Sequence, residues 1–490
     1  MKPILLSALT GLLLLTCSVS TAHAELRAGA DVTDITPLPE HYPISTAGSM
    51  AATFLDGTEE RIHCRTLMLG DATDAEKLVS FTLVDSCLVP RELVDSAKRL
   101  AAEQTGVPAA NFTIAATHTH SAPTSTPAFQ SNPSVAYQIY LAEQIAASIV
   151  TAHRNLEPAE AGWAVGENDE QAFNRRWFVT EPYENPFGVT TDQVRMNPGY
   201  NKGGGKVSKP AGPVDPTLPM LAVRSSKGDK KPIGLLANYT LHYVGNPPRT
   251  ADGKRQLSGD YFDRFARIMA EKVAPDDESY VAILSNGTSG DINNIDYSSP
   301  APEKKYAPGE KMLEVAQSVA DSAFTAFETI EYRTDFPIEV VARELDLGVR
   351  KPNAEDLARA HEILGSPEQL INGNLRAREA IYARETLQLR EYPDTVPVRL
   401  QAYRLGDLCI LTTPCETFVE IGLELKELSP FDLTMVIELA NGYNGYLPTP
   451  QQHEWGGYET WRAKSSYLET EASVKVVEAF EEMLGELKEE

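Results

Sequence analysis

Residues 112–120 read FTIAATHTH, a short and mostly apolar run that ends at once in a polar cluster with two histidines. An apolar run of this length, bounded by polar residues, is typical of a buried β-strand. We therefore expect a strand over 112–116, with His118 and His120 just beyond its carboxyl end. On an extended segment residues i and i+2 point the same way, so both imidazoles can face one point.

The same pattern, an apolar run that stops at polar and chemically capable residues, recurs along the chain. It is found at 79–84 before Asp85, 233–239 before His242, 280–284 before 286–291, 408–411 before 414–416 and 434–439 before 441–446. Residues 91–104 predict a helix that closes near Gly106. Strands mixed with helices predict an α/β fold, in which ligand sites lie just beyond the carboxyl ends of strands. This shared placement predicts one composite active site.

The mature chain is expected to form a single α/β domain over 25–490, with mixed β-sheets flanked by helices. Residues 198–214 are rich in Gly, Pro and Lys and predict a surface loop or flap. Residues 354–390 predict two charged helices that form a solvated insertion. The stretch from about Thr470 predicts a final helix that docks by an apolar stripe. The stripe consists of Val477, Phe480, Leu484 and Leu487.

The N-terminus predicts export. Lys2 precedes an apolar stretch, 4–15, and the chain then reaches Thr-Ala-His-Ala24, a small-x-small pattern. These features are typical of a secretory signal peptide over 1–24, and the apolar stretch is too short to span a membrane. Cys17 follows a weak lipoprotein-like box in which Thr16 fits poorly, so cleavage near Ala24 is favoured. We expect a periplasmic or secreted protein with no integral membrane span.

Charge and cysteine content further limit the functional classes to which the protein can belong. The formal charge of −25 predicts repulsion of nucleic acid and of anionic membrane surfaces. Beyond the signal peptide, no pair of cysteines has the spacing of a zinc knuckle. After export, disulfides and free buried thiols both remain open, and Cys409 and Cys415 are the nearest pair in sequence. The other two cysteines are Cys64 and Cys87. No feature points to a protein partner.

The two histidines of the opening stretch suggest a metal site, because imidazole is a common zinc ligand. Taken alone, His118 and His120 are as compatible with two hydrogen-bonded histidines. His242 and Glu416 each follow an expected strand, where a structural histidine or an exposed carboxylate is the ordinary interpretation. Tyr443 and Tyr446 lie in a Gly-Asn loop, where aromatic packing would explain them. Their common placement at strand ends makes each of these residues a candidate for the active site.

The chain contains several separated motifs, in this order: Gly29-Ala-Asp-Val-Thr-Asp34-Ile-Thr-Pro, Thr117-His-Thr-His120-Ser, the strand leading to His242, Gly290-Asp-Ile-Asn293, Pro414-Cys-Glu416, and Tyr446 followed by Tyr458. In sequence and order they resemble the motifs of the neutral/alkaline non-lysosomal ceramidase family. The resemblance covers nearly the whole mature chain. It implies a ceramidase-like catalytic domain with one zinc ion per chain.

The resemblance also assigns roles to individual residues. The implied zinc ligands are His118, His242, Glu416 and Tyr446. The implied catalytic residues are His120 and Tyr458, with an arginine that is either Arg175 or Arg176; Arg175 is our choice. Asp291, Tyr443 and Trp455, which lie in or beside the motifs, are expected to contact the substrate. Two imidazoles, a carboxylate and a phenol oxygen would leave the open position that a catalytic zinc needs.

The chain departs from the family pattern in two places. Asn293 stands where ceramidases carry a serine, and Asn294 follows in place of proline. Asn cannot act as a nucleophile, although its amide could hydrogen-bond an oxyanion, and we therefore count Asn293 among the candidate catalytic residues. A covalent serine mechanism at this position is thereby excluded. The immunoglobulin-like C-terminal domain of full-length ceramidases is not expected here.

These observations predict an exported zinc hydrolase that cleaves an N-acyl (amide) bond of a small-molecule or lipid-like substrate by activated water. The first alternative keeps the zinc site but changes the reaction to cleavage of an ester or a glycoside, or to an elimination on a sugar. Asn293 and the Trp/Tyr-rich loop would suit this alternative. The second is a non-catalytic exported binding protein. The chain has no Gly-x-Ser-x-Gly, Walker or Gly-x-Gly-x-x-Gly motif, which argues against serine esterases, nucleotide hydrolases and dinucleotide enzymes.

Overall fold

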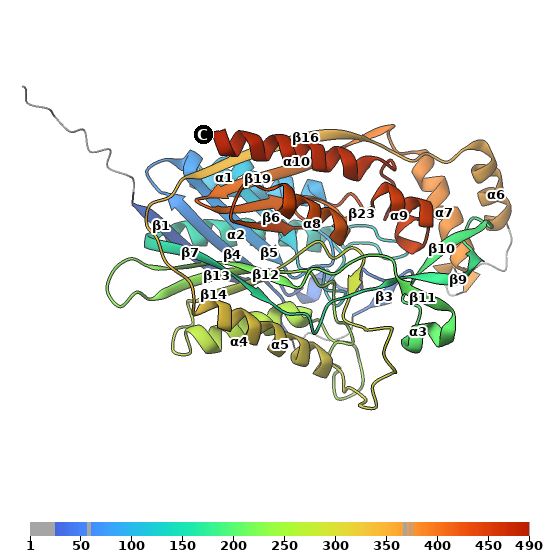
Figure 1. The fold of residues 1–490 in the computed structure, drawn as a ribbon, viewed down its shortest axis with the longest axis horizontal. Coiled ribbons are helices and arrows are strands. Elements are labelled where there is room, and N and C mark those ends of the chain that lie inside the picture. The colour runs from blue at the N-terminus through green and yellow to red at the C-terminus, as the bar shows by residue number, and fades with distance from the viewer. Residues whose placement is uncertain (1–24, 56–59, 366–369, 372–373, 376, 490) are drawn as a thin grey trace, which may run out of the picture.

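The computed structural model describes residues 25–55, 60–365, 370–371, 374–375 and 377–489. The expected signal peptide, 1–24, lies outside the described residues. No helix within the described part is long and apolar enough to cross a membrane. The described chain is built on two β-sheets that lie face to face between helices (Figure 1), so it is of the expected α/β class.

The larger sheet has eight strands in the order β14-β13-β12-β7-β1-β4-β5-β6. Their bounds are β1 (Leu26–Asp34), β4 (His63–Asp71), β5 (Leu78–Val84), β6 (Phe112–Ala116), β7 (Glu157–Glu167), β12 (Thr217–Ser225), β13 (Pro232–Tyr239) and β14 (Val281–Asn286). The pairs β5/β6 and β13/β14 are parallel, whereas all other neighbours in this sheet are antiparallel. The sheet is therefore mixed, as predicted.

The smaller sheet has the order β16-β19-β20-β22. Its strands are β16 (Ile338–Gly348), β19 (Thr395–Leu405), β20 (Leu408–Thr412) and β22 (Leu433–Ile437). The two sheets share one apolar core, in which the ring of Phe81 lies 5.1 Å from that of Tyr403. Val79 and Leu83 join Phe81 in this core, whereas Leu78 and Val84 join the core on the opposite face. This alternation follows from the two-residue period of a strand that is covered on both sides.

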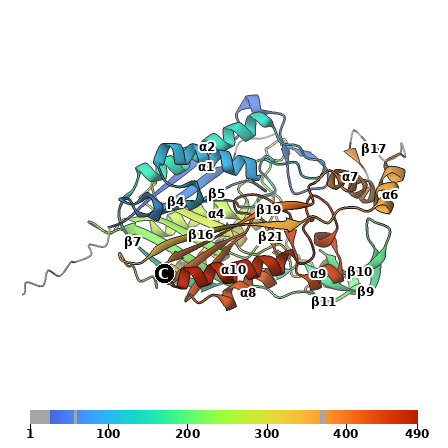
Figure 2. The same cartoon turned by 90° about the horizontal axis from the view of Figure 1, so that it is seen from above.

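Helices cover the outer faces of both sheets. The larger sheet is covered by α1 (Arg91–Thr105) and α2 (Val135–Arg154) over one half and by α4 (Asp260–Val273) and α5 (Glu310–Phe327) over the other. The smaller sheet is covered by α8 (Val419–Leu428) and α10 (Ala472–Glu489). The result is a helix–sheet–sheet–helix sandwich, which Figure 2 shows from above.

The parallel pairs decide where the active site can form. The pairs are β5/β6, β13/β14 and, in the smaller sheet, β20/β22. Backbone hydrogen bonds join the end of β22 to the larger sheet, from Ala116 N to Leu439 O at 3.1 Å and from Glu438 N to Asn286 O at 3.2 Å. The carboxyl ends of strands from both sheets therefore meet at one place, which is the end of the sandwich where the loops carry His118, His242 and Glu416.

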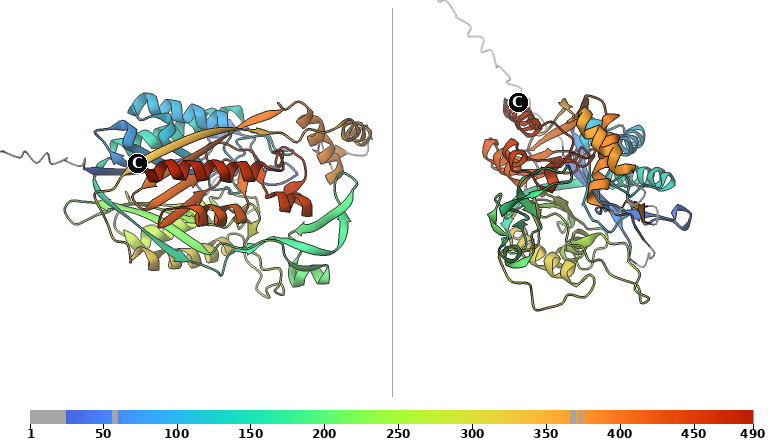
Figure 3. Two further views of the ribbon diagram at one scale, coloured as in Figure 1. Left: turned by 45° about the horizontal axis from the view of Figure 1, so that its top comes forward. Right: turned by 90° about the vertical axis from the view of Figure 1, so that its right-hand side faces the viewer.

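The remaining helices and strands lie outside the two sheets and their covering helices. They are β2 (Ser45–Thr46), β3 (Thr53–Phe54), β8 (Phe173–Asn174), β9 (Arg176–Glu184), β10 (Thr190–Met196), α3 (Tyr200–Gly205), β11 (Val207–Pro210), β15 (Ile292–Asn293), α6 (Ala354–Leu364), β17 (Leu370–Ile371), β18 (Asn374–Leu375), α7 (Arg378–Arg390), β21 (Glu416–Thr417), β23 (Tyr446–Leu447) and α9 (Pro450–Trp455). Figure 3 shows α6 and α7 at the far end of the molecule from the C-terminus.

Several sequence-based expectations can now be compared with the elements. The helix expected at 91–104 is α1, and it ends at Gly106 in the left-handed region. The final helix is α10, with its apolar stripe buried. The expected loop at 198–214 is only partly a loop, because 207–210 pair with β9. The two helices at 354–390 exist, but the solvated insertion is wrong for α7, which buries Tyr382 and Glu385 against its neighbours. All four cysteines of the described chain are buried free thiols.

Gly29 on β1 offers a test of how closely the helical layer packs on the sheet. A methyl group on Gly29 would lie 2.3 Å from the carbonyl oxygen of Ala152 in α2. Gly29→Ala should therefore destabilise the fold by roughly 1–3 kcal/mol, as overpacking does. Thermal and denaturant unfolding would measure the change.

Gly485→Ala is the matched control. Gly485 is an exposed position of α10, and an added methyl group meets no atom within 4 Å. Because alanine is the better helix former, this change should raise stability by up to roughly 1 kcal/mol. Equal stability of the two variants would refute the close contact between β1 and α2.

Candidate active site

Three imidazoles converge at the carboxyl ends of β6 and β13. The Nε2 atom of His118 lies 2.9 Å from Nε2 of His242 and 3.2 Å from Nε2 of His120. His118 and His242 are buried, with 2% and 1% of their surface exposed. The backbone of His118 has a φ of 69°, and its N–H donates to Ser86 O at 2.9 Å. A non-glycine residue held in this region is strained, and such strain is common at functional sites.

Backbone carbonyls orient the two buried rings. Nδ1 of His118 lies 2.8 Å from Cys87 O, and Nδ1 of His242 lies 3.0 Å from Ser289 O. A carbonyl only accepts, so each Nδ1 carries the proton and each Nε2 presents a lone pair. Burial lowers the pKa of His118 and lowers the pKa of His242 well below the ordinary range, which favours neutral rings. Two lone pairs 2.9 Å apart repel each other unless a cation lies between them.

Glu416 completes this cluster. Its Oε2 atom lies 3.5 Å from Nε2 of His118 and 3.6 Å from Nε2 of His242. This oxygen is buried and has no hydrogen-bond partner, whereas Oε1 accepts from the hydroxyl of Tyr443 at 2.8 Å. A buried carboxylate oxygen without a partner is costly. A metal ion held by these three residues would satisfy the oxygen and both lone pairs, so the donor set fits a metal.

Tyr446 is placed beside Glu416 by a short parallel pairing of strands. Glu416 and Tyr446 are register partners in the β21/β23 pair. The hydroxyl of Tyr446 accepts from Nη2 of Arg175 at 3.1 Å. The ring of Tyr458 lies 5.9 Å from that of Tyr446. Burial raises the pKa of both phenols, so both keep their protons at neutral pH in this environment.

The structure decides which arginine faces the site. Both guanidinium groups bind the fully buried Glu459, Arg175 through Nε at 2.9 Å and Arg176 through Nη1 at 2.6 Å. Only Arg175 reaches Tyr446, whereas Arg176 bonds to Gln452 and the backbone of Gly456. Arg175 is therefore the arginine at the candidate site, and Arg176 supports it through Glu459.

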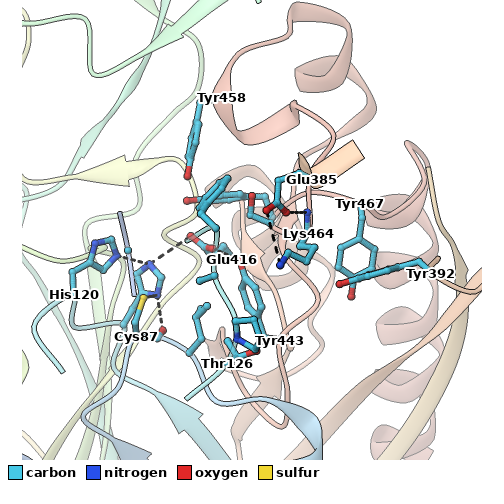
Figure 4. A pocket seen from close by; sticks show the side chains of 18 residues that line it. Cys87, His120, Thr126, Glu385, Tyr392, Glu416, Tyr443, Tyr458, Lys464 and Tyr467 are labelled. Atoms are coloured by element: carbon cyan, nitrogen blue, oxygen red, sulfur yellow. Dashed lines mark hydrogen bonds and ion pairs between the residues drawn. The ribbon is translucent and has the colours of Figure 1, made fainter. Parts of the chain in front are cut away.

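A pocket of about 130 Å³ opens onto this cluster (Figure 4). Of the expected site residues, it is lined by His118, His120, Glu416, Tyr443, Tyr446 and Tyr458. His242 does not line the pocket, but it contacts His118, which does. Tyr458 also lines a second, neighbouring pocket together with Trp461 and Asn197.

Asn293, Asp291 and Trp455 lie outside the lining of the main pocket, as do His242 and Arg175. The amide of Asn293 donates to Asn197 at 2.8 Å and to the Tyr297 hydroxyl at 3.1 Å, and its oxygen accepts from Ile295 N. Asp291 has no exposed surface, and its oxygens accept from Val419 N and from Asn174.

Trp455 is the third of these residues. It is half-buried and packs against Phe178, with ring centroids 4.8 Å apart. The arrangement gives Asp291 and Trp455 supporting positions and places neither at the cluster of histidines.

Other residues that the sequence patterns did not single out also support the cluster. Glu438 is fully buried, accepts from the Ser289 hydroxyl at 2.6 Å, and has a pKa raised well above its ordinary range by burial. Tyr243 stacks on His120 with ring centroids 3.5 Å apart. Tyr243 directly follows His242, and Glu438 lies near the end of the strand expected over 434–439. Their positions at strand ends could therefore have indicated a place near the site, although their residue types did not.

A second group of potential ligands in the described chain, His63, Asp85 and Asp263, does not share these properties. Arg65 lies between the two carboxylates and forms ion pairs with both of them. The charges of this group are thus compensated by an arginine, and the group contains no opposed pair of imidazole lone pairs.

No protein-family model matches the sequence, and no curated protein matches it. The solved structures that share the fold include two ceramidases. The neutral ceramidase from Pseudomonas aeruginosa is 17% identical at a TM-score of 0.68, over 95% of this chain and 75% of that chain. A ceramidase complexed with C2 is 17% identical at a TM-score of 0.66, over 95% of this chain and 76% of that chain. Over nearly all of its length, the chain therefore has the fold of the neutral ceramidases.

Proposed function

We propose that the protein is an exported, zinc-dependent hydrolase that cleaves an N-acyl (amide) bond. The observation that carries the proposal is the unpartnered, buried Oε2 of Glu416, which faces the Nε2 lone pairs of His118 and His242. The ceramidase-like fold agrees with a hydrolase. Export rests on the pattern of the N-terminal residues.

The residues that would hold zinc are His118, His242, Glu416 and Tyr446. Two imidazole nitrogens with carboxylate and phenol oxygens form the mixed donor set that zinc accepts. When bound, zinc would supply Lewis-acid polarisation of a carbonyl and activation of water. The carbonyls of Cys87 and Ser289 fix the tautomers of the two histidines for this role.

His120 is the residue best placed to take a proton. Its ring is held by stacking on Tyr243 and by a hydrogen bond to the Gly48 backbone, and its Nε2 points toward the cluster. Burial lowers the pKa of His120 well below the ordinary range, so the ring is neutral and its Nε2 lone pair is free at neutral pH. A positioned base of this kind typically contributes roughly a hundred- to ten-thousand-fold in rate.

Tyr458 is the residue best placed to donate to an oxyanion. It lines the pocket, and because burial raises its pKa, its hydroxyl stays protonated as charge develops on the substrate. Arg175 holds the neighbouring Tyr446 hydroxyl in place. Asn293 cannot act as a nucleophile, and we propose direct attack by water. Of the features that suited the sugar-directed alternative, Asn293 and Trp455 do not line the pocket, whereas tyrosines of the Trp/Tyr-rich loop do. The amide bond is our choice because the fold is ceramidase-like.

The metal assignment is tested by His242→Ala. Removing this ligand should weaken zinc binding by more than the roughly 10–100-fold typical of losing an outer hydrogen-bond partner. The wild type should carry one zinc per chain after dialysis, measured by plasma mass spectrometry, and the variant should carry little.

The control is His361→Ala, because His361 is exposed on α6 and belongs to none of the groups of potential metal ligands among the described residues. This variant should keep its zinc, and circular dichroism should show that both variants are folded. Full zinc occupancy in folded His242→Ala would remove His242 from the ligand set.

The catalytic assignment is tested by Tyr458→Phe. This variant should keep its zinc but lose roughly a hundred- to a thousand-fold in kcat on N-acyl substrates, because one donor to the oxyanion is lost. Tyr306→Phe, which removes a hydroxyl bonded to Glu314 on the surface, is the matched control and should leave kcat unchanged. Near-wild-type kcat in a zinc-loaded Tyr458→Phe protein would reduce Tyr458 to a packing role.

A further inference from the structure

The wall of the pocket that lies across from His120 is polar rather than apolar. Figure 4 shows Glu385, Lys464, Tyr392 and Tyr467 on this wall, with Glu416 between them and His120. Lys464 and Glu385 are 19% and 1% exposed at their side chains. Charged groups this enclosed are uncommon in a pocket wall unless they serve a ligand or a fixed ion pair.

The charged groups of this wall are only loosely paired. Oε1 of Glu385 lies 3.9 Å from Nζ of Lys464 and 3.6 Å from Nη2 of Arg384, and it makes no hydrogen bond. Oε2 accepts from the backbone N–H of Lys464 at 3.2 Å. Two cations thus face one carboxylate. Among the described residues, Lys464 forms one ion pair, with Glu385, and its distance of 3.9 Å is too long for a hydrogen bond.

The neighbouring tyrosines add hydrogen-bond donors. The hydroxyl of Tyr467 accepts from Asn444 at 2.9 Å, which leaves its own proton to donate. Tyr392 packs edge-on against Tyr467, with ring centroids 5.3 Å apart. Burial raises the pKa of Tyr392 to about 12, so its hydroxyl is a donor at neutral pH. One ammonium and two phenol protons on the same wall call for a ligand that accepts hydrogen bonds and carries negative charge.

We propose that Lys464, Tyr392 and Tyr467 form a subsite for a carboxylate on the substrate, so that the enzyme acts on small N-acylated amino acids or similar carboxylate-bearing amides. This inference rests on the proposed hydrolase function and names its substrate class. A carboxylate would give the ammonium of Lys464 a closer partner than Glu385 provides at 3.9 Å. The long alkyl chains of a ceramide would instead strip water from Lys464 and Glu385 without replacing its hydrogen bonds. The pocket volume of about 130 Å³ agrees with a small ligand.

Hydrolysis provides the first test. The zinc-loaded full chain is assayed with N-acetylglycine, N-acetyl-β-alanine and N-acetyl-4-aminobutyrate, each against its neutral carboxamide, and with a short-chain ceramide. At least one carboxylate should exceed its carboxamide by about tenfold to a hundredfold in kcat/KM, because charge-assisted hydrogen bonds are strong. Lys464→Met should abolish this preference by raising KM for the carboxylate while leaving kcat within a few fold. Lys464→Arg should retain most of it.

Binding provides a second readout that does not need turnover. Succinate and succinamate each offer one carboxylate to the metal, but only succinate offers a second one to Lys464. By calorimetry, succinate should bind zinc-loaded wild type at least about tenfold more tightly than succinamate, and Lys464→Met should remove the difference. Lys475→Met, which breaks a surface ion pair between Lys475 on α10 and Glu469 before that helix, is the matched control. If Lys464→Met does not fold, the paired substrates and ligands still decide the question on the wild type.

The two proposals fail in different ways. Equal kcat/KM for carboxylates and carboxamides, together with equal binding of succinate and succinamate, would overturn the carboxylate subsite and leave amide hydrolysis standing. Binding of succinate that depends on Lys464, with no hydrolysis of any amide, would overturn the proposed hydrolase and leave the subsite standing. Preference for the ceramide over every carboxylate would also overturn the subsite.

Discussion

The candidate site depends on the backbone hydrogen bonds that join the end of β22 to the larger sheet. Ala116 N donates to Leu439 O, and Asn441 N donates to Ile114 O at 2.7 Å. Leu439 and Asn441 both have positive φ angles, 54° and 64°, so the chain turns sharply here to make these bonds. Two sheets that pack through apolar side chains alone could slide, but these directional bonds fix the ends of their strands against each other. The histidines of one sheet and Glu416 of the other thereby reach one point.

This convergence buries many polar groups, and the fold satisfies most of them internally. Glu459 is shared by Arg175 and Arg176, and Glu438 accepts from Ser289 and from the backbone of Thr417. Such buried networks are costly when incomplete and rigid when complete. The one carboxylate oxygen of the cluster that stays unsatisfied is Oε2 of Glu416, at the point where two imidazole lone pairs also meet. Oε2 of Glu416 and the two imidazole lone pairs thus leave unmet interactions at the point where a cation would lie.

The fold and the pocket carry different kinds of information about function. The ceramidase-like fold places the cluster, but a fold can host many substrates, because specificity depends on the side chains of the pocket. Here the wall formed by Lys464, Glu385 and the two tyrosines is contributed by α7 with the turn that follows it and by the loop before α10. Neither segment belongs to the two central sheets. The scaffold that supports the proposed chemistry is therefore separate from the segments that would choose the substrate.

The sequence by itself was enough to predict the α/β class, the strand that leads to His118, and the terminal helix with its apolar stripe. These features depend on local periodicity, which neighbouring residues determine. It also placed His118, His242 and Glu416 at strand ends, and the resemblance proposed that they act together. The roles of individual site residues remain predictions, although the structure brings six of them to one pocket.

The tertiary structure alone decided which of the candidates meet. It showed that Arg175, and not Arg176, contacts Tyr446 at the site. It also showed that Asn293 and Trp455 do not line the pocket. It showed that α7, whose charges suggested a solvated helix, is buried and contributes Glu385 to the wall. Local sequence patterns could not predict these contacts. Lys464 comes close to Glu385 and Tyr392 only when segments far apart in the chain pack together. Periodicity determines which face of an element is buried, but the partner that covers it depends on the whole fold.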